Sequence, residues 1–528
     1  MAGFAARQCS EPHSQQVCPA RQGGAPRGRP GCDAGALRTT LVGVSGEPVV
    51  VVGAGPVGLT AALLLARRGL HVLVLERHRV PYDLPRAVHL DDEVFRVLQD
   101  AGVADDLAPL TRPLAGLRLV GAGRSVLAEF RRDPAAGLNG WPQGSLVHQP
   151  DLEAVLATAA ARTPGVELRR GVEVTGLLVD GDGVTLTVRD RHDGADRSVR
   201  AAAVLGCDGA NSAVRDLIGA RMRNLGPADR WLVLDVRSPA PLPIWPGVSQ
   251  VCDPDRAATF MPVTGDRYRW EFRLAPGETV ADLTTTAALR RLLAPVDPAA
   301  VEVLRSAEYT FRAQVADRWR SGRVLLAGDA AHLTPPFVGQ GLGLGLRDVH
   351  QLSWKLAAVL AGEADDALLD SHQAEREPHA RALIRLALLL GRLMTGGGRG
   401  AAGTRRAVLA VVRRLPVVAR LATDSRTPPL RGPLIDRRGR AGRRLAGSLV
   451  PQPEVTVDGR RCRLDDVLGD GAAVLTDGLE VCRADGTQAW VEDPTGTLHR
   501  WLGSASAVQL RPDRIVGGVR NRSGGAPV

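Results

Sequence analysis

A single carboxylate and several glycines follow the apolar segment 324–327, with a spacing typical of a cofactor site. That segment predicts a buried strand, and Gly328-Asp329 comes directly after it. A carboxylate at the end of a strand can accept hydrogen bonds from ribityl or ribose hydroxyls. The glycines open a helical pattern, and the first turn of a helix favours an anion because its N–H groups lack backbone partners. Residues 323–355 are therefore predicted to form the floor of a flavin site. The backbone N–H groups expected at the flavin N1/O2 edge are those of Gly339, Gly341, Leu342 and Gly343.

A second group of glycines lies between two apolar segments near residue 50. The order of strand, glycine turn, helix, strand and acid is that of the unit that binds dinucleotides. We expect Gly53 to make the tight turn, Gly55 to let the backbone approach a pyrophosphate, and Gly58 to let helix and strand pack closely. Glu76 ends the second strand, where it is placed to accept hydrogen bonds from the adenosine ribose.

Several stretches resemble the single-component, or group A, FAD-dependent aromatic hydroxylases. GDAAH, the pair Pro335-Pro336 and the following GQG resemble their second FAD motif. The stretches PRAVHLDDEVFRVLQ, HQPDLE, YRWEFRL and HLTPPFVGQG make the chain most similar to the 3-(3-hydroxyphenyl)propionate hydroxylase and para-hydroxybenzoate hydroxylase family. The resemblance covers most of residues 48–520. It implies an α/β fold in which a Rossmann-like FAD-binding domain is interleaved with a β-sheet substrate domain, followed by helices and a small thioredoxin-like C-terminal domain.

The resemblance also implies roles for residues outside the two glycine segments. Arg86 is implied to reach the FAD pyrophosphate, and Gln149 to lie against the flavin. Asp208-Gly209 follows an apolar strand and resembles a motif that contacts both FAD and the nicotinamide cofactor. Pro336 is implied to help wall the space in which oxygen is held. At Gly343 the para-hydroxybenzoate hydroxylases carry a polar residue, so contacts with the flavin there would be made by the backbone alone.

The implied activity is that of an FAD-dependent, NAD(P)H-consuming monooxygenase. Such an enzyme uses NADH or NADPH and O2 to hydroxylate a phenolic or polyketide-type aromatic through a flavin C4a-hydroperoxide. The alternatives are a flavin dehydrogenase or oxidase on the same fold, and a non-catalytic flavin-binding protein. The general base that activates a phenol is not identified by the sequence. His89, His148 and His332 lie near the motifs, and a structural role is the other interpretation of each.

Three aromatic residues concentrate on one face of the predicted strand 267–273, in a chain with only 3% aromatic residues. Alternation places Tyr268, Trp270 and Phe272 together and the charged residues on the opposite face. The aromatic face could line a substrate pocket or pack the sheet on its neighbour, and the sequence does not decide between them.

Changes of pattern divide the chain into nine predicted segments. The FAD-binding domain is expected in three separate portions, with substrate-domain segments between them and a linker before the last domain. The segments are 1–46, a disordered N-terminal extension; 47–111, the first FAD-binding portion; 112–147, a substrate-domain hairpin; 148–225, the second FAD-binding portion; 226–305, the substrate-binding sheet; 306–378, the third FAD-binding portion; 379–430, a helical segment; 431–449, a linker; and 450–528, a thioredoxin-like domain without a redox dithiol.

Composition excludes several other classes of protein. Residues 381–444 hold sixteen Arg and two Asp, and the rest of the chain is slightly acidic. That basic segment has no Phe, Tyr or Trp, which argues against nucleic-acid binding. Helices predicted at 381–394 and 405–423 carry arginine stripes, which fit solvated faces better than a membrane surface. No apolar run is long enough for a membrane span.

The seven cysteines have no paired spacing, so we expect no metal site and a reduced, cytoplasmic protein. The expected partner is a small aromatic substrate, and a homodimer is left open.

Overall fold

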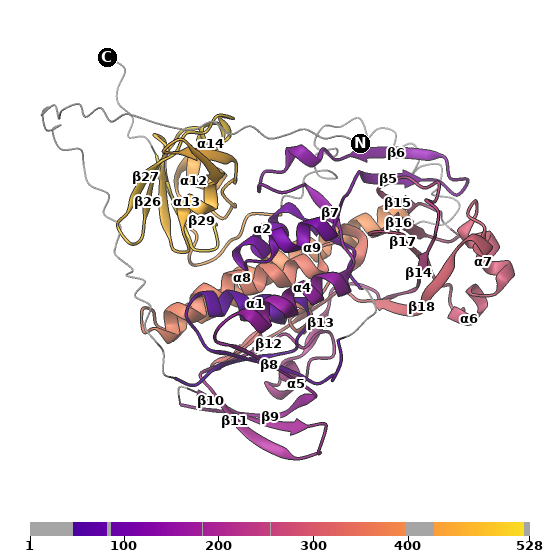
Figure 1. Cartoon of the computed structure of the whole chain (residues 1–528), viewed down its shortest axis with the longest axis horizontal. Coiled ribbons are helices and arrows are strands. Elements are labelled where there is room, and N and C mark those ends of the chain that lie inside the picture. Colours follow the sequence, from indigo (N-terminus) through magenta and orange to yellow (C-terminus); the bar gives the residue numbers. More distant parts are fainter. Residues whose placement is uncertain (1–45, 82–85, 182, 254, 396–426, 522–528) are drawn as a thin grey trace, which may run out of the picture.

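The computed structural model describes residues 46–81, 86–181, 183–253, 255–395 and 427–521. Figure 1 shows three bodies: a parallel sheet with helices on it, a mostly antiparallel sheet beside it, and a small C-terminal domain near two long helices. The chain thus has the mixed α/β architecture that the sequence predicts. The N-terminal extension up to residue 45, the glycine run 396–398 and the second arginine helix at 405–423 lie outside the described residues.

A six-stranded sheet forms the centre of the first body, in the order β20-β21-β12-β1-β2-β8. All neighbouring strands pair in parallel except β20 with β21. The inner strands are short and apolar because both faces of the sheet are covered. The bounds are β1 Val49–Val52, β2 Val72–Glu76, β8 Val166–Arg170, β12 Ala203–Gly206, β20 Arg320–Ser321 and β21 Val324–Leu326.

Helices cover one face of this sheet and a second sheet covers the other (Figure 1). The helical layer consists of α1 Pro56–Arg67, α4 Gln149–Arg162 and α8 Gly341–Leu360. The second sheet consists of β9 Val172–Asp180, β10 Gly183–Asp190 and β11 Asp196–Ala201. The carboxyl ends of β1, β12 and β21 remain at one edge, where parallel sheets bind ligands.

A seven-stranded sheet stands beside this body, in the order β18-β14-β17-β16-β15-β5-β6. Strands from two distant regions of the chain meet in it, because β5 pairs with β15. Two short helices, α6 Val280–Leu283 and α7 Thr286–Leu293, pack on its outer face. The strands are β5 Gly116–Val120, β6 Val126–Arg131, β14 Asp229–Arg237, β15 Val248–Val251, β16 Ala258–Pro262, β17 Arg267–Arg273 and β18 Glu302–Phe311.

The long helix α9, Asp370–Thr395, corrects one predicted boundary. We predicted a helix from residue 381 and a domain boundary after residue 378, but α9 continues through Pro378. Its first turns are held by buried polar contacts to α8, such as Arg376 to Asp348 at 2.8 Å. These turns lack the apolar period by which a helix is recognised in a sequence.

The C-terminal domain has a core of its own and a five-stranded sheet in which every pairing is antiparallel. The sheet order is β27-β26-β25-β28-β29, and a separate hairpin, β23-β24, precedes it in the chain. The elements are α12 Gly439–Leu445, β23 Glu454–Val457, β24 Arg460–Arg463, α13 Leu464–Leu468, β25 Ala473–Thr476, β26 Glu480–Arg483, β27 Gln488–Trp490, α14 Thr497–Leu502, β28 Ala505–Leu510 and β29 Val516–Asn521.

The predicted linker at 431–449 is partly wrong, because it contains α12 and contributes to the C-terminal core. Ala441 and Leu445 are each only 1% exposed. Their spacing of four residues puts both on one face of a helical turn, while the intervening arginines project outward. The density of arginine in this stretch concealed that short apolar face.

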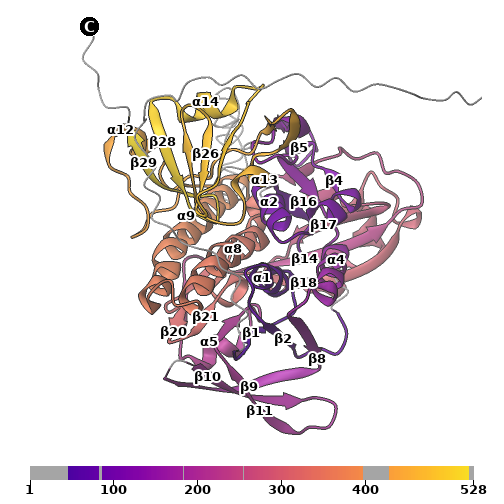
Figure 2. The same ribbon diagram turned by 60° about the vertical axis from the view of Figure 1, so that its left-hand side comes forward.

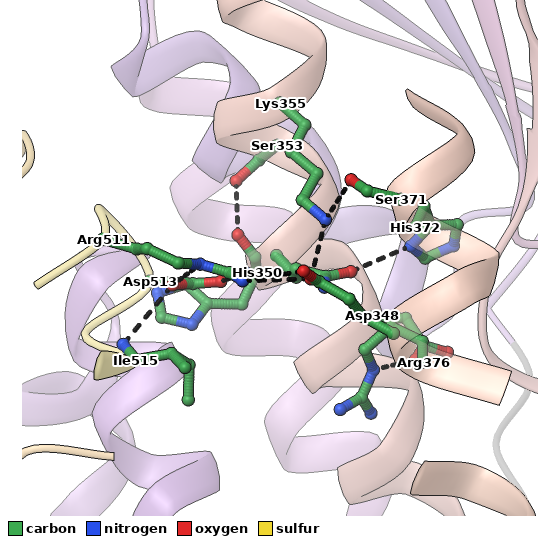
Figure 3. Close-up of polar contacts among 12 residues, drawn as sticks. Asp348, His350, Ser353, Lys355, Ser371, His372, Arg376, Arg511, Asp513 and Ile515 are labelled. Carbon is green, nitrogen blue, oxygen red and sulfur yellow. Dashed lines mark hydrogen bonds and ion pairs between the residues drawn. The ribbon is translucent and has the colours of Figure 1, made fainter. Parts of the chain in front are cut away.

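Figure 2 shows the C-terminal domain beside α8 and α9, and buried ion pairs join these parts (Figure 3). Arg511 donates to Glu375 of α9 at 3.0 and 3.1 Å and to Asp513 at 3.0 Å. Lys355 of α8 donates to the same Glu375 at 2.9 Å. A second contact pairs Arg96 with Asp465. Burial lowers the pKa of Lys355 to about 8, although Glu375 opposes that shift.

Within the described ranges, no helix is both long enough and apolar enough to cross a membrane.

We expect Arg511→Met to lower the free energy of unfolding by about 3–5 kcal/mol, because it leaves Asp513 buried without its guanidinium partner. Urea titration followed by tryptophan fluorescence measures the change. The control is Arg461→Met in the same domain, since the Arg461–Glu454 pair is exposed and should contribute little. Equal effects of the two substitutions would contradict the role of the buried pair.

Candidate functional site

The turn between β1 and α1 is built from glycines for three different reasons. Gly53 has φ +102°, and a Cβ on it would lie 2.6 Å from the carbonyl oxygen of Cys207. A Cβ on Gly58 would lie 1.9 Å from the carbonyl oxygen of Gly53, so helix and strand could not pack as closely. A Cβ on Gly55 would meet open space. The backbone at Gly55 is therefore exposed toward the edge of the sheet.

The first turn of α1 is free to bind an anion. Its N-cap is Gly55, with no capping side chain and no acidic residue in the first turn. The uncapped N–H groups and the positive end of the helix dipole favour a phosphate at this position. Glu76 lies beside the turn, where its Oε2 accepts a hydrogen bond from the Ala54 N–H at 2.8 Å. Its other oxygen accepts from the His78 N–H at 2.8 Å, so the carboxylate also holds the turn in place.

The turn after β12 lies next to the glycine turn. Asp208 accepts hydrogen bonds from the Ser212 hydroxyl and, at 3.1 Å, from the Val214 N–H. Ser212 in turn caps the short helix α5, Ala213–Leu217. Gly209 has φ +82° and open space around it. The Asp208 carboxylate thus shapes the turn, while Gly209 leaves its surface accessible.

Asp329 presents a carboxylate without a protein partner among the described residues. It is half-buried in the short helix η4, Gly328–Ala330, which follows β21. Burial raises the pKa of Asp329, while the nearby charges of His332 and Arg86 oppose the shift. Such a carboxylate can accept hydrogen bonds from a ligand, which would replace lost hydration.

The start of α8 is a second uncapped helix end. Its N-cap residue Gln340 turns its side chain inward, donating to Asp91 at 2.8 Å and accepting from Arg347 at 2.8 Å. The first turn, which contains Leu342, holds no acidic residue, and a Cβ on Gly341 would meet open space. The first N–H groups of α8 therefore remain available to a ligand.

The two other glycines of this segment fit closely against side chains. Gly339 has φ +62°, and a Cβ there would lie 3.0 Å from Nδ1 of His89. A Cβ on Gly343 would lie 2.7 Å from Nη1 of Arg347, so Gly343 leaves room for the Gln340–Arg347 contact. The packing at Gly343 was not predicted, because nothing in the sequence indicates the hydrogen bond between Arg347 and Gln340.

Gln149 binds the backbone of residues 86 and 87, which we call the Arg86 segment. Its Oε1 accepts from the N–H groups of Arg86 at 3.1 Å and Ala87 at 2.7 Å, and its Nε2 donates to Glu153 at 2.7 Å. Its amide holds the segment that carries Arg86, and the contact with the flavin that the resemblance implies stays a prediction. Arg269 reaches the same segment from the seven-stranded sheet, donating to the Arg86 carbonyl at 2.7 Å.

The proline segment lies between the start of α8 and the seven-stranded sheet. Pro335 precedes the turn η5, Pro336–Val338, and Pro336 is half-buried. The Phe337 ring meets Trp231 of β14 edge-on, with 6.0 Å between the ring centroids. The segment is therefore anchored on the sheet by an aromatic contact.

Tyr268, Trp270 and Phe272 pack into the core between the seven-stranded sheet and helices α6 and α7. Their exposed fractions are 8%, 1% and 3%. Of the two alternatives, the structure has core packing rather than a pocket lining. The charged face of β17 is buried as well, and it faces the Arg86 and proline segments. Alternation separated the two faces of the strand, but it did not show that the charged face is buried.

The three histidines near the motifs are all engaged with the protein. Burial, with Arg132 beside the ring, lowers the pKa of His89 to about 4, so that ring is neutral at pH 7. His332 is buried, with Nε2 2.6 Å from Asp348. Nδ1 of His148 lies 3.1 Å from Asp151. Each histidine has the structural surroundings that were the alternative to a catalytic role.

Together these features fit an extended dinucleotide such as FAD. The fit rests on two uncapped helix starts, open space in front of Gly55 and Gly341, and the unpartnered carboxylate of Asp329. Phosphates suit the first helix start, and a polar heterocycle that becomes anionic on reduction suits the second.

Comparison with known proteins agrees with this geometry. A family model described as an FAD binding domain matches residues 47–387. The chain is 35% identical over 499 residues to a probable NADH-specific resorcinol 4-hydroxylase of Rhodococcus jostii (strain RHA1), covering 89% of this chain and 91% of that protein. It is also 35% identical over 512 residues to a 3-(3-hydroxy-phenyl)propionate/3-hydroxycinnamic acid hydroxylase of Mycobacterium sp. (strain KMS), covering 89% and 88%.

A solved structure is similar over nearly the whole chain. It is the ternary complex of aklavinone-11 hydroxylase with FAD and aklavinone, with a TM-score of 0.73 and 25% sequence identity. The match covers 90% of this chain and 96% of that protein.

We expect Gly55→Ala to leave the fold intact and to weaken FAD binding by about tenfold or more, which corresponds to at least roughly 1.4 kcal/mol. The added methyl group would occupy the open space in front of the turn. Fluorescence titration of the apoprotein with FAD measures the affinity, and thermal unfolding of the apoprotein measures the stability.

The matched control is Gly123→Ala, since a Cβ there also meets open space but lies far from the glycine turn. Equal FAD affinity of the two variants would exclude a ligand in front of Gly55.

Proposed function

Because the chain belongs to the family of FAD-dependent aromatic hydroxylases, we propose that it hydroxylates a phenolic or polyketide-type aromatic ring, with NADH or NADPH and O2 as co-substrates. The observation that carries the proposal is the unpartnered Asp329 carboxylate beside the uncapped start of α8. A dehydrogenase or oxidase on the same fold, or a flavin-binding protein without turnover, is less consistent with the relatives, which are named as hydroxylases.

Bound FAD would accept two electrons from the nicotinamide and would activate O2, so that one oxygen atom can be transferred to the ring. The residues of the chain hold the cofactor in our proposal. The N–H groups after Gly55 bind the pyrophosphate, with the Arg86 guanidinium as a second contact, and Glu76 accepts from the ribose. Asp329 accepts from the ribityl chain, and the first N–H groups of α8 bind the N1/O2 edge.

The start of α8 also stabilises negative charge in this proposal. Reduction makes the N1/O2 edge of a flavin anionic, and preorganised N–H groups stabilise such a charge without reorganising. A side chain at Gly341 would enter the open space of that approach, whereas one at Gly339 would meet the His89 ring. The proline segment from Pro335 to Phe337 is proposed to exclude water from the reacting ring, since it closes against Trp231 of the sheet.

The substrate class is inferred from the relatives. Resorcinol and hydroxyphenylpropionate are small phenols, and aklavinone is bound in the ternary complex of the structural relative. The names in the first two relatives indicate a hydroxylated aromatic ring. NADH is the first co-substrate to test, because one relative is named as NADH-specific.

For the C-terminal domain we propose a structural or oligomerisation role. Its predicted resemblance to thioredoxin stays a prediction, and a homodimer stays one as well. The described cysteines, including Cys462 and Cys482 of this domain, are free thiols. Buried arginines of the same domain bind Glu375 of α9 and Asp465.

The purified protein should bind FAD, and a phenol should accelerate its oxidation of NADH. Labelled O2 should place one oxygen atom in the product, detected by mass spectrometry with resorcinol and 3-(3-hydroxyphenyl)propionate as the first substrates. Bound FAD without any phenol-stimulated NADH oxidation across a broad panel of aromatics would contradict the proposed function.

Asp329→Ala should weaken FAD binding by about 10- to 100-fold, the effect of losing a hydrogen bond to a charged group. Glu363→Ala is the control, because Glu363 is an exposed carboxylate just beyond the other end of α8. Unchanged FAD affinity of the Asp329 variant, measured by titration of the apoprotein, would rule out the ribityl contact.

A further inference from the structure

We propose that the Glu271 carboxylate accepts the phenolic proton of the substrate, an inference that rests on the proposed function. In this step the O–H bond of the phenol breaks and an O–H bond forms on Glu271. The electron pair stays on the ring oxygen, so the ring becomes an electron-rich phenolate and nothing is oxidised. The deprotonated ring is then the better nucleophile for the oxygen that is transferred.

Glu271 lies on the inner face of the seven-stranded sheet. Residues of β17 alternate, so Glu271 and Arg269 share one face while Trp270 and Phe272 share the other. The aromatic residues pack against α6 and α7 on the outer side. The inner face is the one that meets the FAD-binding body, because Arg269 donates to the Arg86 carbonyl.

The position of Glu271 along the strand is equally specific. On the inner face, β14 and β17 form three successive pairs: Trp231 with Arg273, Val233 with Glu271, and Asp235 with Arg269. Successive pairs are about 7 Å apart, since a strand rises roughly 3.4 Å per residue.

Two segments of the predicted flavin site close on either side of Glu271. The Phe337 ring contacts Trp231 of the first pair, and the Arg86 carbonyl binds Arg269 of the third. Glu271 belongs to the middle pair. Its carboxylate therefore lies between the proline segment and the Arg86 segment, at the level where an aromatic substrate would face the flavin.

The carboxylate of Glu271 is available to a ligand. Glu271 is 9% exposed, and its carboxylate accepts no hydrogen bond from the described residues. The nearest cation is Arg269, whose Nη1 is 3.9 Å from Oε1, too far for a hydrogen bond. Arg269 instead donates to Asp235 at 2.7 and 3.1 Å. A buried carboxylate with free lone pairs is stabilised when a ligand donates to it.

The surroundings of Glu271 also suit proton transfer near neutral pH. Burial raises the pKa of Glu271, Arg269 opposes the shift, and Asp235 adds to it. A base whose pKa lies closer to the working pH transfers protons more efficiently. The ionisable groups on the inner face within one residue pair of Glu271, from β14, β17 and β18, are Asp235, Arg269, Arg273, Arg305 and Tyr309. Asp229, Arg237, Arg267 and Glu302 lie on the same face farther along the strands. On β16 the residue opposite Glu271 is the uncharged Thr259.

Two other buried ionisable groups near Glu271, Asp235 and His89, already have partners in the protein. Asp235 has both oxygens bound by Arg269. His89 contacts Arg132 at 3.2 Å and is packed against Gly339. Glu271 is thus the buried carboxylate of this face that is not already engaged.

The test compares the wild-type holoenzyme with Glu271→Gln, which keeps the size of the side chain and removes the base. Glu271→Asp retains a carboxylate, and Glu308→Gln removes an exposed one that pairs with Arg230 on the same sheet. FAD content and thermal stability establish that each variant is folded and loaded.

We expect Glu271→Gln to lower the hydroxylation rate of 3-(3-hydroxyphenyl)propionate by about 10²-fold or more, the usual contribution of a general base. The wild-type rate should fall as the pH drops below the pKa of Glu271, and that acidic limb should be absent in Glu271→Gln and present in Glu271→Asp. The deficit of Glu271→Gln should shrink with ring-fluorinated resorcinols, which ionise at lower pH in solution. Glu308→Gln should match the wild type.

A binding measurement separates the base from a merely structural carboxylate. Calorimetry should give the wild type about 10- to 100-fold preference for 3-(3-hydroxyphenyl)propionate over its 3-methoxy ether, and Glu271→Gln should lose that preference. A Glu271→Gln enzyme that hydroxylates within a few-fold of the wild-type rate and keeps both the acidic limb and the ligand preference would overturn the inference. A wild-type enzyme that hydroxylates no phenol would overturn the proposed function, and the inference with it.

Discussion

The Asp348 carboxylate fixes the geometry on which the site depends. It accepts a hydrogen bond from the Gly328 N–H at 3.1 Å, pairs with His332 at 2.6 Å and receives Arg376 of α9 at 2.8 Å. One buried charge on α8 therefore ties the turn that carries Asp329 to the helix whose start is proposed to face the flavin. Figure 3 shows its contact with Arg376. Burial alone would raise the pKa of Asp348, and His332 and Arg376 lower it well below its ordinary value. A fully buried carboxylate persists only with such partners.

Charge pairing of the same kind continues along α8 and organises the rest of the molecule. One turn after another, its buried polar side chains reach the helix α2, Asp92–Asp100, and α9, and through α9 the C-terminal domain. The seven-stranded sheet is attached differently, through Arg269 at the Arg86 segment and through the Trp231–Phe337 contact. Apolar packing of β5 and β6 against Met394 of α9 adds to these contacts. The proposed substrate face is therefore positioned by local contacts, whereas the proposed cofactor site is positioned by the buried ionic contacts of one helix.

The sequence predicted those features of the site that depend on the backbone. Gly53 and Gly58 are dictated by steric contacts within one strand-turn-helix unit, so their spacing alone carries the information. The amides of Gln149 and Gln340 could not be assigned, because each binds groups brought near by tertiary packing. The orientation of β17 was equally hidden: both faces are buried, and alternation gives two faces without saying which one meets the flavin. The start of α9 was missed because its buried face is polar.

Lys355 gives the buried contacts of α8 a practical consequence. It is the only lysine in the sequence, and in the fold it is fully buried. A lysine-specific protease has therefore one peptide bond to cleave in this chain, in the middle of a packed helix. Cleavage there requires α8 to separate from α9 and Arg511, so the appearance of two fragments would report the opening of the interior rather than the accessibility of the surface.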